Sequence, residues 1–186
     1  MNITELICEF IQKIIRKEIE IYNEASIQYE LAIFLRNKLP DYKIQLERNV
    51  SYFGLVKSDF IKKEMDIVIF NNDKTSKTAI EIKFPTNGQY PEQMFSFCKD
   101  IKFLEQLKSK GFSDNTFICF ADDSNFWSGN AEENSIYRLF RKLEPITGLI
   151  QKPTGHKDEQ LNITGSYVAN WQRINNLMRY FIVRVF

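Results

Sequence analysis

The sequence predicts a single α/β domain, because segments with helical periodicity alternate with short apolar segments of strand character. The chain has 186 residues, which is enough for one domain with a sizeable core. Hydrophobic residues make up 44% and aromatic residues 14%, as is typical of a globular chain rather than a disordered one. No segment has the composition of a linker, so we expect one domain over residues 1–186.

Two helices are predicted before residue 40. Apolar residues recur at helical spacing over residues 4–22, with Thr4 as the expected cap, which places an N-terminal helix within residues 1–22. A second helix is predicted over residues 24–39, with Asn23 as its cap and Pro40 at its end.

Three strands are expected next. Residues 42–53 alternate as a strand does, up to Gly54. Residues 60–70 and 78–85 are apolar and flank a polar segment rich in turn formers, which predicts an antiparallel hairpin. The remaining elements are a helix that starts near Pro91 and ends before Gly111, a strand over 115–121, a helix over 131–143, a mobile loop over 143–162 and a strand over 178–186.

Composition excludes several classes of function. The formal net charge is +1, so the chain as a whole does not attract nucleic acid or a membrane surface, although a local basic patch would suffice. No apolar run approaches the roughly 20 residues that span a bilayer, and the N-terminus lacks a signal-peptide pattern, so we expect a cytoplasmic protein without a membrane partner.

The cysteines and the histidine add further exclusions. The three cysteines lie far apart and are expected to be buried, reduced thiols. The only histidine is His156, expected to be solvated in a polar loop, which argues against Ser-His-Asp, Cys-His and multi-histidine metal chemistry. An enzyme built on this sequence would therefore depend on carboxylates, lysine, a hard metal ion or a combination of them.

One charged group stands out within the hairpin. Glu81 and Lys83 lie two apart in the strand "TAIEIKFP" and therefore point to the same face, opposite to Ile80 and Ile82. If Phe70 lies opposite Thr78 or Lys77, then Asp66 lies close to Glu81 or directly faces it.

Facing carboxylates repel each other unless a cation lies between them. Carboxylate oxygens with water suit Mg²⁺, and a nearby lysine such as Lys83 could bind phosphate or hold an attacking water. These are the parts of phosphodiester hydrolysis.

This pattern resembles the PD-(D/E)XK, or restriction endonuclease-like, nuclease superfamily: Asp66, fourteen residues, then Glu81-Ile82-Lys83, with a carboxylate on a preceding helix. The resemblance implies a central mixed sheet flanked by helices in α-β-β-β-α-β order, which the chain offers over residues 24–121, followed by a helix, loop and strands over 122–186. It implies that Asp66 and Glu81 are ligands of Mg²⁺, for which Mn²⁺ could substitute, and that Lys83 is the catalytic lysine. Met65 replaces the family's proline before the aspartate.

The resemblance also implies a helix carboxylate and an accessory residue. The carboxylate would be Glu30 or Glu24, and Glu30 is preferred because it lies closer to the following strand. Gln93, at the start of the helix after the motif, would be the accessory residue; the alternative is an ordinary helix-start residue.

The tripeptide alone is not specific. Asp41-Tyr42-Lys43 and Asp100-Ile101-Lys102 have the same spacing, but the first lies in a turn and the second on a helix, where residues two apart do not share a face. The alternative for Asp66, Glu81 and Lys83 is a solvated sheet face with an ordinary salt bridge, against which the apolar flanking residues argue.

The sequence thus predicts a Mg²⁺-dependent nuclease, most simply a DNA endonuclease, with RNA as the other candidate substrate. A homodimer would allow cleavage of both strands of a duplex. The alternative is a catalytically inactive module of the same fold that binds DNA or a protein, because a fold does not imply an activity.

Overall fold

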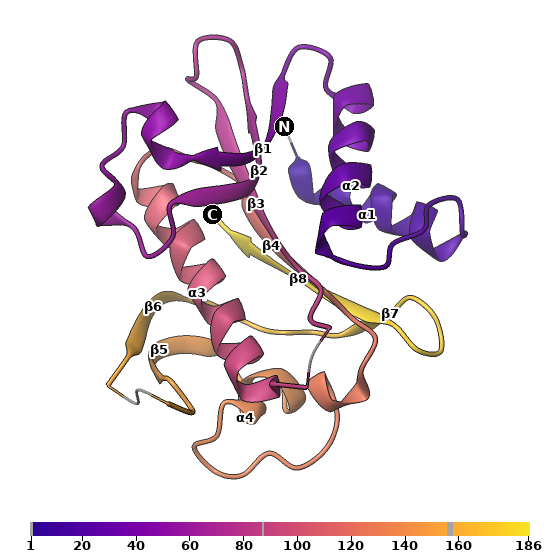
Figure 1. Ribbon diagram of the computed structural model, residues 1–186, viewed down its shortest axis with the longest axis vertical. Coiled ribbons are helices and arrows are strands. Elements are labelled where there is room, and N and C mark those ends of the chain that lie inside the picture. The colour runs from indigo at the N-terminus through magenta and orange to yellow at the C-terminus, as the bar shows by residue number, and fades with distance from the viewer. Residues whose placement is uncertain (1, 87, 156–157) are drawn as a thin grey trace.

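The computed structural model describes residues 2–86, 88–155 and 158–186, and it is a mixed α/β structure with a six-stranded mixed sheet flanked by helices (Figure 1). The strand order in the sheet is β1-β2-β3-β4-β8-β7, and β5 and β6 form a separate two-stranded sheet. The helices are α1 (Ile3–Ile15), α2 (Glu24–Lys38), α3 (Tyr90–Ser109) and α4 (Tyr137–Arg141). The strands are β1 (Lys43–Asn49), β2 (Glu64–Phe70), β3 (Lys77–Lys83), β4 (Asn115–Ala121), β5 (Ile146–Gln151), β6 (Gln160–Tyr167), β7 (Gln172–Arg173) and β8 (Arg179–Val185).

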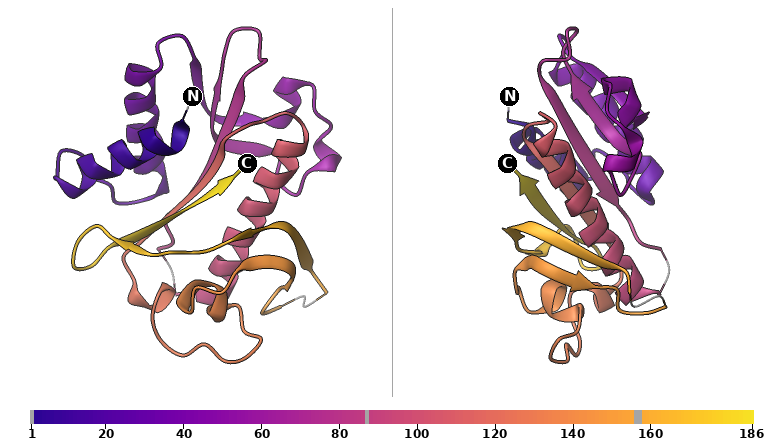
Figure 2. Two further views of the ribbon diagram at one scale, coloured as in Figure 1. Left: turned by 180° about the vertical axis from the view of Figure 1, so that it is seen from behind. Right: turned by 90° about the vertical axis from the view of Figure 1, so that its left-hand side faces the viewer.

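The main sheet is covered on both faces. Helices α1 and α2 lie on one side, and α3 with the β5–β6 hairpin lies on the other, as Figures 1 and 2 show. Ile80, Ile82 and Phe84 pack under α1 and α2, whereas Ala79 of the same strand packs under α3. The predicted split of this strand is therefore confirmed, and Glu81 and Lys83 belong to the face that α3 covers.

The connections place α3 next to the hairpin. Strands β1, β2 and β3 are antiparallel neighbours, and β3 and β4 are parallel, joined by α3 as the crossover helix. Asn115 fixes this unit, because its side chain accepts a hydrogen bond from the Ala79 amide at 3.0 Å and donates one to the Leu104 carbonyl at 3.2 Å. The helix is thus held against the strand that carries Glu81.

The N-terminal helix is shorter than predicted. It ends at Ile15, because Lys17 adopts a left-handed conformation with a φ of 60° and the Glu18 amide bonds back to the Lys13 carbonyl at 2.9 Å. A glycine at this position would have indicated the end of the helix, but the residue is a lysine. The sequence pattern therefore predicted a helix that continues to residue 22. The cap is the Asn2 side chain rather than Thr4.

Three later predictions are also corrected. The first strand ends at Asn49 and is followed by a 3-10 turn over Val50–Phe53. Only Tyr137–Arg141 of the helix predicted over 131–143 is helical. The segment predicted as a mobile loop over 143–162 contains β5 and the first part of β6.

The β5–β6 hairpin is fixed to α3 by a buried carboxylate. Glu105 accepts hydrogen bonds from the amides of Thr164 at 3.0 Å and Gly165 at 2.7 Å, and from the Tyr167 hydroxyl at 3.1 Å. Burial raises the pKa of the Glu105 carboxyl, but the amides of Gly165 and Thr164 and the Lys102 ammonium outweigh it and lower the pKa overall. Glycines and prolines interrupt this segment in the sequence. The alternation of buried residues that forms the hairpin was therefore not recognised as a strand pattern.

Other expectations concern single residues. Cys98 and Cys119 are buried and free as predicted, whereas Cys8 is free but exposed. His156 lies outside the described residues. None of the helices in the described part of the chain has the length and apolar character that crossing a membrane requires.

Candidate functional site: a buried acid–lysine cluster

The hairpin register places Asp66 and Glu81 side by side. Phe70 pairs with Lys77 and Ile67 with Ile80, which is the second of the two predicted registers and continues to Asp66 opposite Glu81. The pairing of β2 with β3 stops at Ile67 and Ile80, so the two carboxylates lie where the strands begin to separate.

Each carboxylate then replaces a missing ladder bond. Asp66 Oδ2 accepts a hydrogen bond from the Ile82 amide at 2.7 Å, and Glu81 Oε1 accepts one from the Asp66 amide at 3.4 Å. These bonds fix both side chains relative to the backbone. The exposed fraction is 6% for Asp66 and 0% for Glu81, which excludes the solvated sheet face considered above.

A third carboxylate joins the pair from α3. Asp100 is 2% exposed, and its Oδ2 accepts no hydrogen bond within the described residues. Helical spacing explains its direction, because Asp100 lies three residues after Phe97 and four before Leu104, both of which are buried in the core that α3 forms with the sheet. Asp100 is therefore an acidic residue in the middle of the apolar stripe.

The ammonium of Lys62 lies among these three carboxylates. Its Nζ lies 2.8 Å from Asp100 Oδ1 and 3.8 Å from Asp66 Oδ1, and it forms a short ion pair and hydrogen bond with Glu81 Oε2. Lys62 belongs to the segment just before β2, and its side chain is 27% exposed. Lys62 thus takes the position between facing carboxylates for which a cation was expected.

Lys83 lies at the edge of the same cluster. Its Nζ lies 3.4 Å from Asp100 Oδ2 and 3.4 Å from Glu24 Oε1, and it donates to the Ile82 carbonyl at 3.0 Å. The structure therefore brings together Asp66, Glu81 and Lys83 as predicted, through Asp100 and Lys62, which the sequence interpretation missed.

Burial and charge shift the acidity of the cluster. Burial raises the pKa of Asp66 to about 6, against the opposing charges of Lys62 and Lys83. Burial and then the charge of Asp66 raise the pKa of Glu81 well above its usual range. Burial alone would lower the pKa of Lys62 and of Lys83, but the neighbouring carboxylates outweigh it and raise both. Both lysines are therefore ammonium ions at neutral pH.

Of the two helix carboxylates, Glu24 lies at the cluster. Glu24 contacts the Lys83 ammonium, whereas Glu30 forms no hydrogen bond or ion pair within the described residues. Glu24 begins α2 on the same face as the buried residues Ile27 and Leu31, and Glu30 lies about 120° around the helix from it. The sequence-based preference for Glu30 considered its distance along the chain from the following strand, but not its angular position around the helix.

Gln93 lies in the first turn of α3, half-buried, seven residues before Asp100 and hence on the same face of the helix. The backbone amide of Gln93 donates a hydrogen bond to the backbone carbonyl of Gln89 at 2.9 Å. Its position is compatible with the predicted accessory role, about two helical turns from the cluster.

The donor set of the cluster suits a hard divalent cation. Asp66, Glu81 and Asp100 offer carboxylate oxygens around one position, and Asp100 Oδ2 is buried with no hydrogen bond, its ion-pair partner being the Lys83 ammonium at 3.4 Å. In the described residues, no group of three or more histidine, cysteine or carboxylate side chains is arranged to hold a metal ion directly, and Lys62 lies at the position in question. Carboxylate oxygens are the ligands that Mg²⁺ and Mn²⁺ prefer, and in this structure the Lys62 ammonium fills the position between them.

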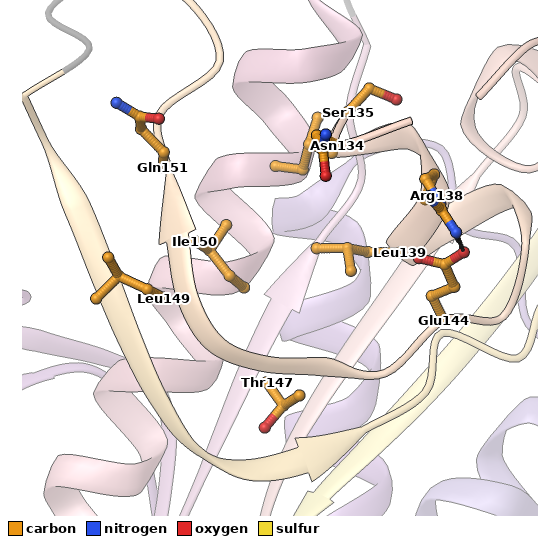
Figure 3. Close-up of a pocket in the computed structure, with 10 residues that line it drawn as sticks. Asn134, Ser135, Arg138, Leu139, Glu144, Thr147, Leu149, Ile150 and Gln151 are labelled. Carbon is orange, nitrogen blue, oxygen red and sulfur yellow. Dashed lines mark hydrogen bonds and ion pairs between the residues drawn. The ribbon is translucent and has the colours of Figure 1, made fainter. Parts of the chain in front are cut away.

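Two surface cavities differ in their relation to the cluster. One of about 340 Å³ opens beside Lys62 and reaches Asp66; its lining residues are Glu47, Ile61, Lys62, Lys63, Glu64 and Asp66. Another of about 340 Å³ lies between α4 and β5, where Arg138 is paired with Glu144 (Figure 3). The second cavity has no lining residue in common with the cluster, so only the first connects the buried charges to solvent.

Comparison of the chain with protein-family models, curated proteins and solved structures finds no match. The function must therefore be inferred from the chemistry of the cluster.

Proposed function

We propose that the chain is a metal-dependent nuclease of the restriction endonuclease-like type, which hydrolyses phosphodiester bonds of DNA. The observation that carries the proposal is the convergence of Asp66, Glu81 and Asp100 from two strands and a helix, with Lys83 at their edge. Buried carboxylates beside a lysine are the groups that a hard metal ion and a phosphate require together. The order α2, β1, β2, β3, α3, β4 also agrees with the arrangement that the resemblance implies.

In this proposal Asp66 and Glu81 hold the metal ion, and Asp100 faces the same position. A bound Mg²⁺ would supply a water of lowered pKa and positive charge beside the scissile phosphate. The backbone amides that bind Asp66 and Glu81 keep these carboxylates in place before a metal ion arrives.

Lys83 acts as a cation rather than as a general base. Its neighbouring carboxylates raise its pKa despite burial, so it keeps its protons at neutral pH. It would then orient the attacking water by donating to it and would offset the charge that develops on the phosphate. Glu24 positions this ammonium at the start of α2.

The proposal is tested by the cleavage of duplex DNA in Mg²⁺ or Mn²⁺, with EDTA as the blank. Asp66→Asn keeps an oxygen for the Ile82 amide but removes the charge, and Lys83→Met keeps most of the side-chain volume. Each should lower the cleavage rate by about 100-fold or more. If both variants cut as fast as the parent protein, the proposal is wrong. An RNA of the same sequence distinguishes the substrates.

The second candidate is a catalytically inactive module of the same type. One observation favours it: Lys62 already balances the carboxylates, so the cluster can be stable without a metal ion. A protein that binds DNA but shows no cleavage, and whose affinity for Mn²⁺ is unchanged by Asp66→Asn, would favour the module.

A further inference from the structure

The position of Lys62 is the feature that the proposed reaction leaves unexplained. An ammonium carries one positive charge and lies within 4.0 Å of three buried carboxylates. A divalent ion that binds Asp66 and Glu81 would have to lie in the same region. Two cations this close repel each other strongly in a poorly solvated site, so they cannot both remain there.

The charge balance favours exchange of one cation for the other. The three carboxylates of Asp66, Glu81 and Asp100 carry three negative charges when ionised, and Lys62 with Lys83 supplies two positive charges. One negative charge is left over. A divalent ion in the place of the Lys62 ammonium would balance these three buried carboxylates together with Lys83, and a buried site favours such a balance. Glu24, the more exposed partner of Lys83, adds one further negative charge at the edge.

The surroundings of Lys62 allow its side chain to move while its backbone stays in place. The Lys63 carbonyl accepts from the Val50 amide at 2.8 Å, and the Ile61 amide donates to Gln106 Oε1 at 3.0 Å. The backbone on both sides of Lys62 is thus fixed. The cavity beside it is lined by Glu47 and Glu64 as well as by Lys63, and the two glutamates would receive the ammonium near solvent.

We propose that Lys62 is an internal, displaceable cation: it fills the carboxylate cluster in the metal-free protein and withdraws into the adjoining cavity when a divalent metal ion binds. This inference relies on the proposed function, because the metal ion belongs to it. The consequence is that Lys62 stabilises the empty site and lowers its apparent metal affinity, since the binding-competent arrangement is only partly populated.

The first test follows the Lys62 amine in the unaltered protein. An acylating reagent modifies exposed lysines, and mass spectrometry reports the rate at each one. Addition of Mn²⁺ to the EDTA-treated protein should raise the rate at Lys62 several-fold and leave the rate at the exposed Lys57, outside the cavity, unchanged. An unchanged rate at Lys62 under conditions where Mn²⁺ binding is saturated would overturn the inference.

The second test measures the affinity for Mn²⁺ through the electron paramagnetic resonance signal of the free ion. Lys62→Met should bind Mn²⁺ about tenfold more tightly or better, and the control Lys57→Met, an exposed lysine outside this cavity, should bind like the parent protein. Should Lys62→Met fold only when Mn²⁺ is present, as followed by circular dichroism, the exchange of cations is equally supported.

The outcomes separate the two proposals. Equal affinities of the parent and Lys62→Met, both lost in Asp66→Asn, would overturn the displaceable cation and leave the metal site intact. The absence of Mn²⁺ binding in the parent and in Lys62→Met would overturn both.

Discussion

Removal of the Lys62 charge should destabilise the metal-free protein strongly. Lys62→Met keeps a long apolar side chain but leaves three buried carboxylates without their closest cation. At an effective dielectric constant of about 20, the attraction between charges 2.8 Å apart, as for Asp100, is about 6 kcal/mol. At 3.8 Å, as for Asp66, it is about 4 kcal/mol.

Most of this attraction is offset by the cost of removing the ammonium from water. Deletion of one partner of a buried ion pair typically costs about 3–5 kcal/mol, and we expect a value in this range for Lys62→Met in EDTA. For a chain of this size, that lowers the melting temperature by roughly 10 °C.

The assay is urea unfolding at pH 7.5 in EDTA, followed by the fluorescence of Trp127 and Trp171. Lys63→Met is the control, since an exposed lysine in the same segment should change the free energy of unfolding by less than about 0.5 kcal/mol. A loss below about 1 kcal/mol for Lys62→Met would show that Lys62 does not balance the cluster, and the reasoning above would fail.

Three further predictions concern the surroundings of the cluster. Glu24→Gln should lower the rate of Mg²⁺-dependent DNA cleavage about tenfold or more, because it releases the lysine of the site, whereas Glu30→Gln should stay within about twofold; equal effects would refute the assignment of the helix carboxylate. Glu105→Gln should cost about 2 kcal/mol at neutral pH. Because the folded-state pKa of Glu105 is lowered, this stabilisation is complete above about pH 4.5 and is lost as the pH falls through the folded-state value, so the urea curves of variant and parent should converge in acid. Asn115→Ala should cost about 2–3 kcal/mol in thermal unfolding, because it leaves a strand amide and a helix carbonyl without partners; a loss under about 1 kcal/mol would contradict that role.

The hairpin shows what the sequence could predict. Its turn composition and alternation left two registers open, both of which bring Asp66 near Glu81, and the structure has the second, with Phe70 opposite Lys77. Local patterns of this kind are sufficient where neighbouring strands are close in the chain. The same holds for α2, which Asn23 caps, and for α3, which has Pro91 in its first turn and Gly111 just past its end.

The other members of the cluster depend on contacts between distant segments. Asp100 gave a usable signal, because a charged residue in the middle of an apolar helical stripe needs a buried partner. Lys62 gave no such signal, since it lies in an irregular segment with no periodicity. Its direction depends on the carboxylates and the Phe103 ring that it meets in the folded chain. Glu24 and Glu30 differ by their angle around α2, which becomes decisive once the position of α2 on the sheet is known.

The central claim is that the carboxylate cluster binds a divalent metal ion. The most direct measurement is a crystal structure of the protein soaked in Mn²⁺, with anomalous scattering to locate the ion. The account predicts an anomalous peak within about 2.5 Å of carboxylate oxygens of Asp66 and Glu81, with the Lys62 ammonium withdrawn toward Glu47 and Glu64. A structure at saturating Mn²⁺ with no peak in the cluster, and with Lys62 still among the three carboxylates, would contradict it.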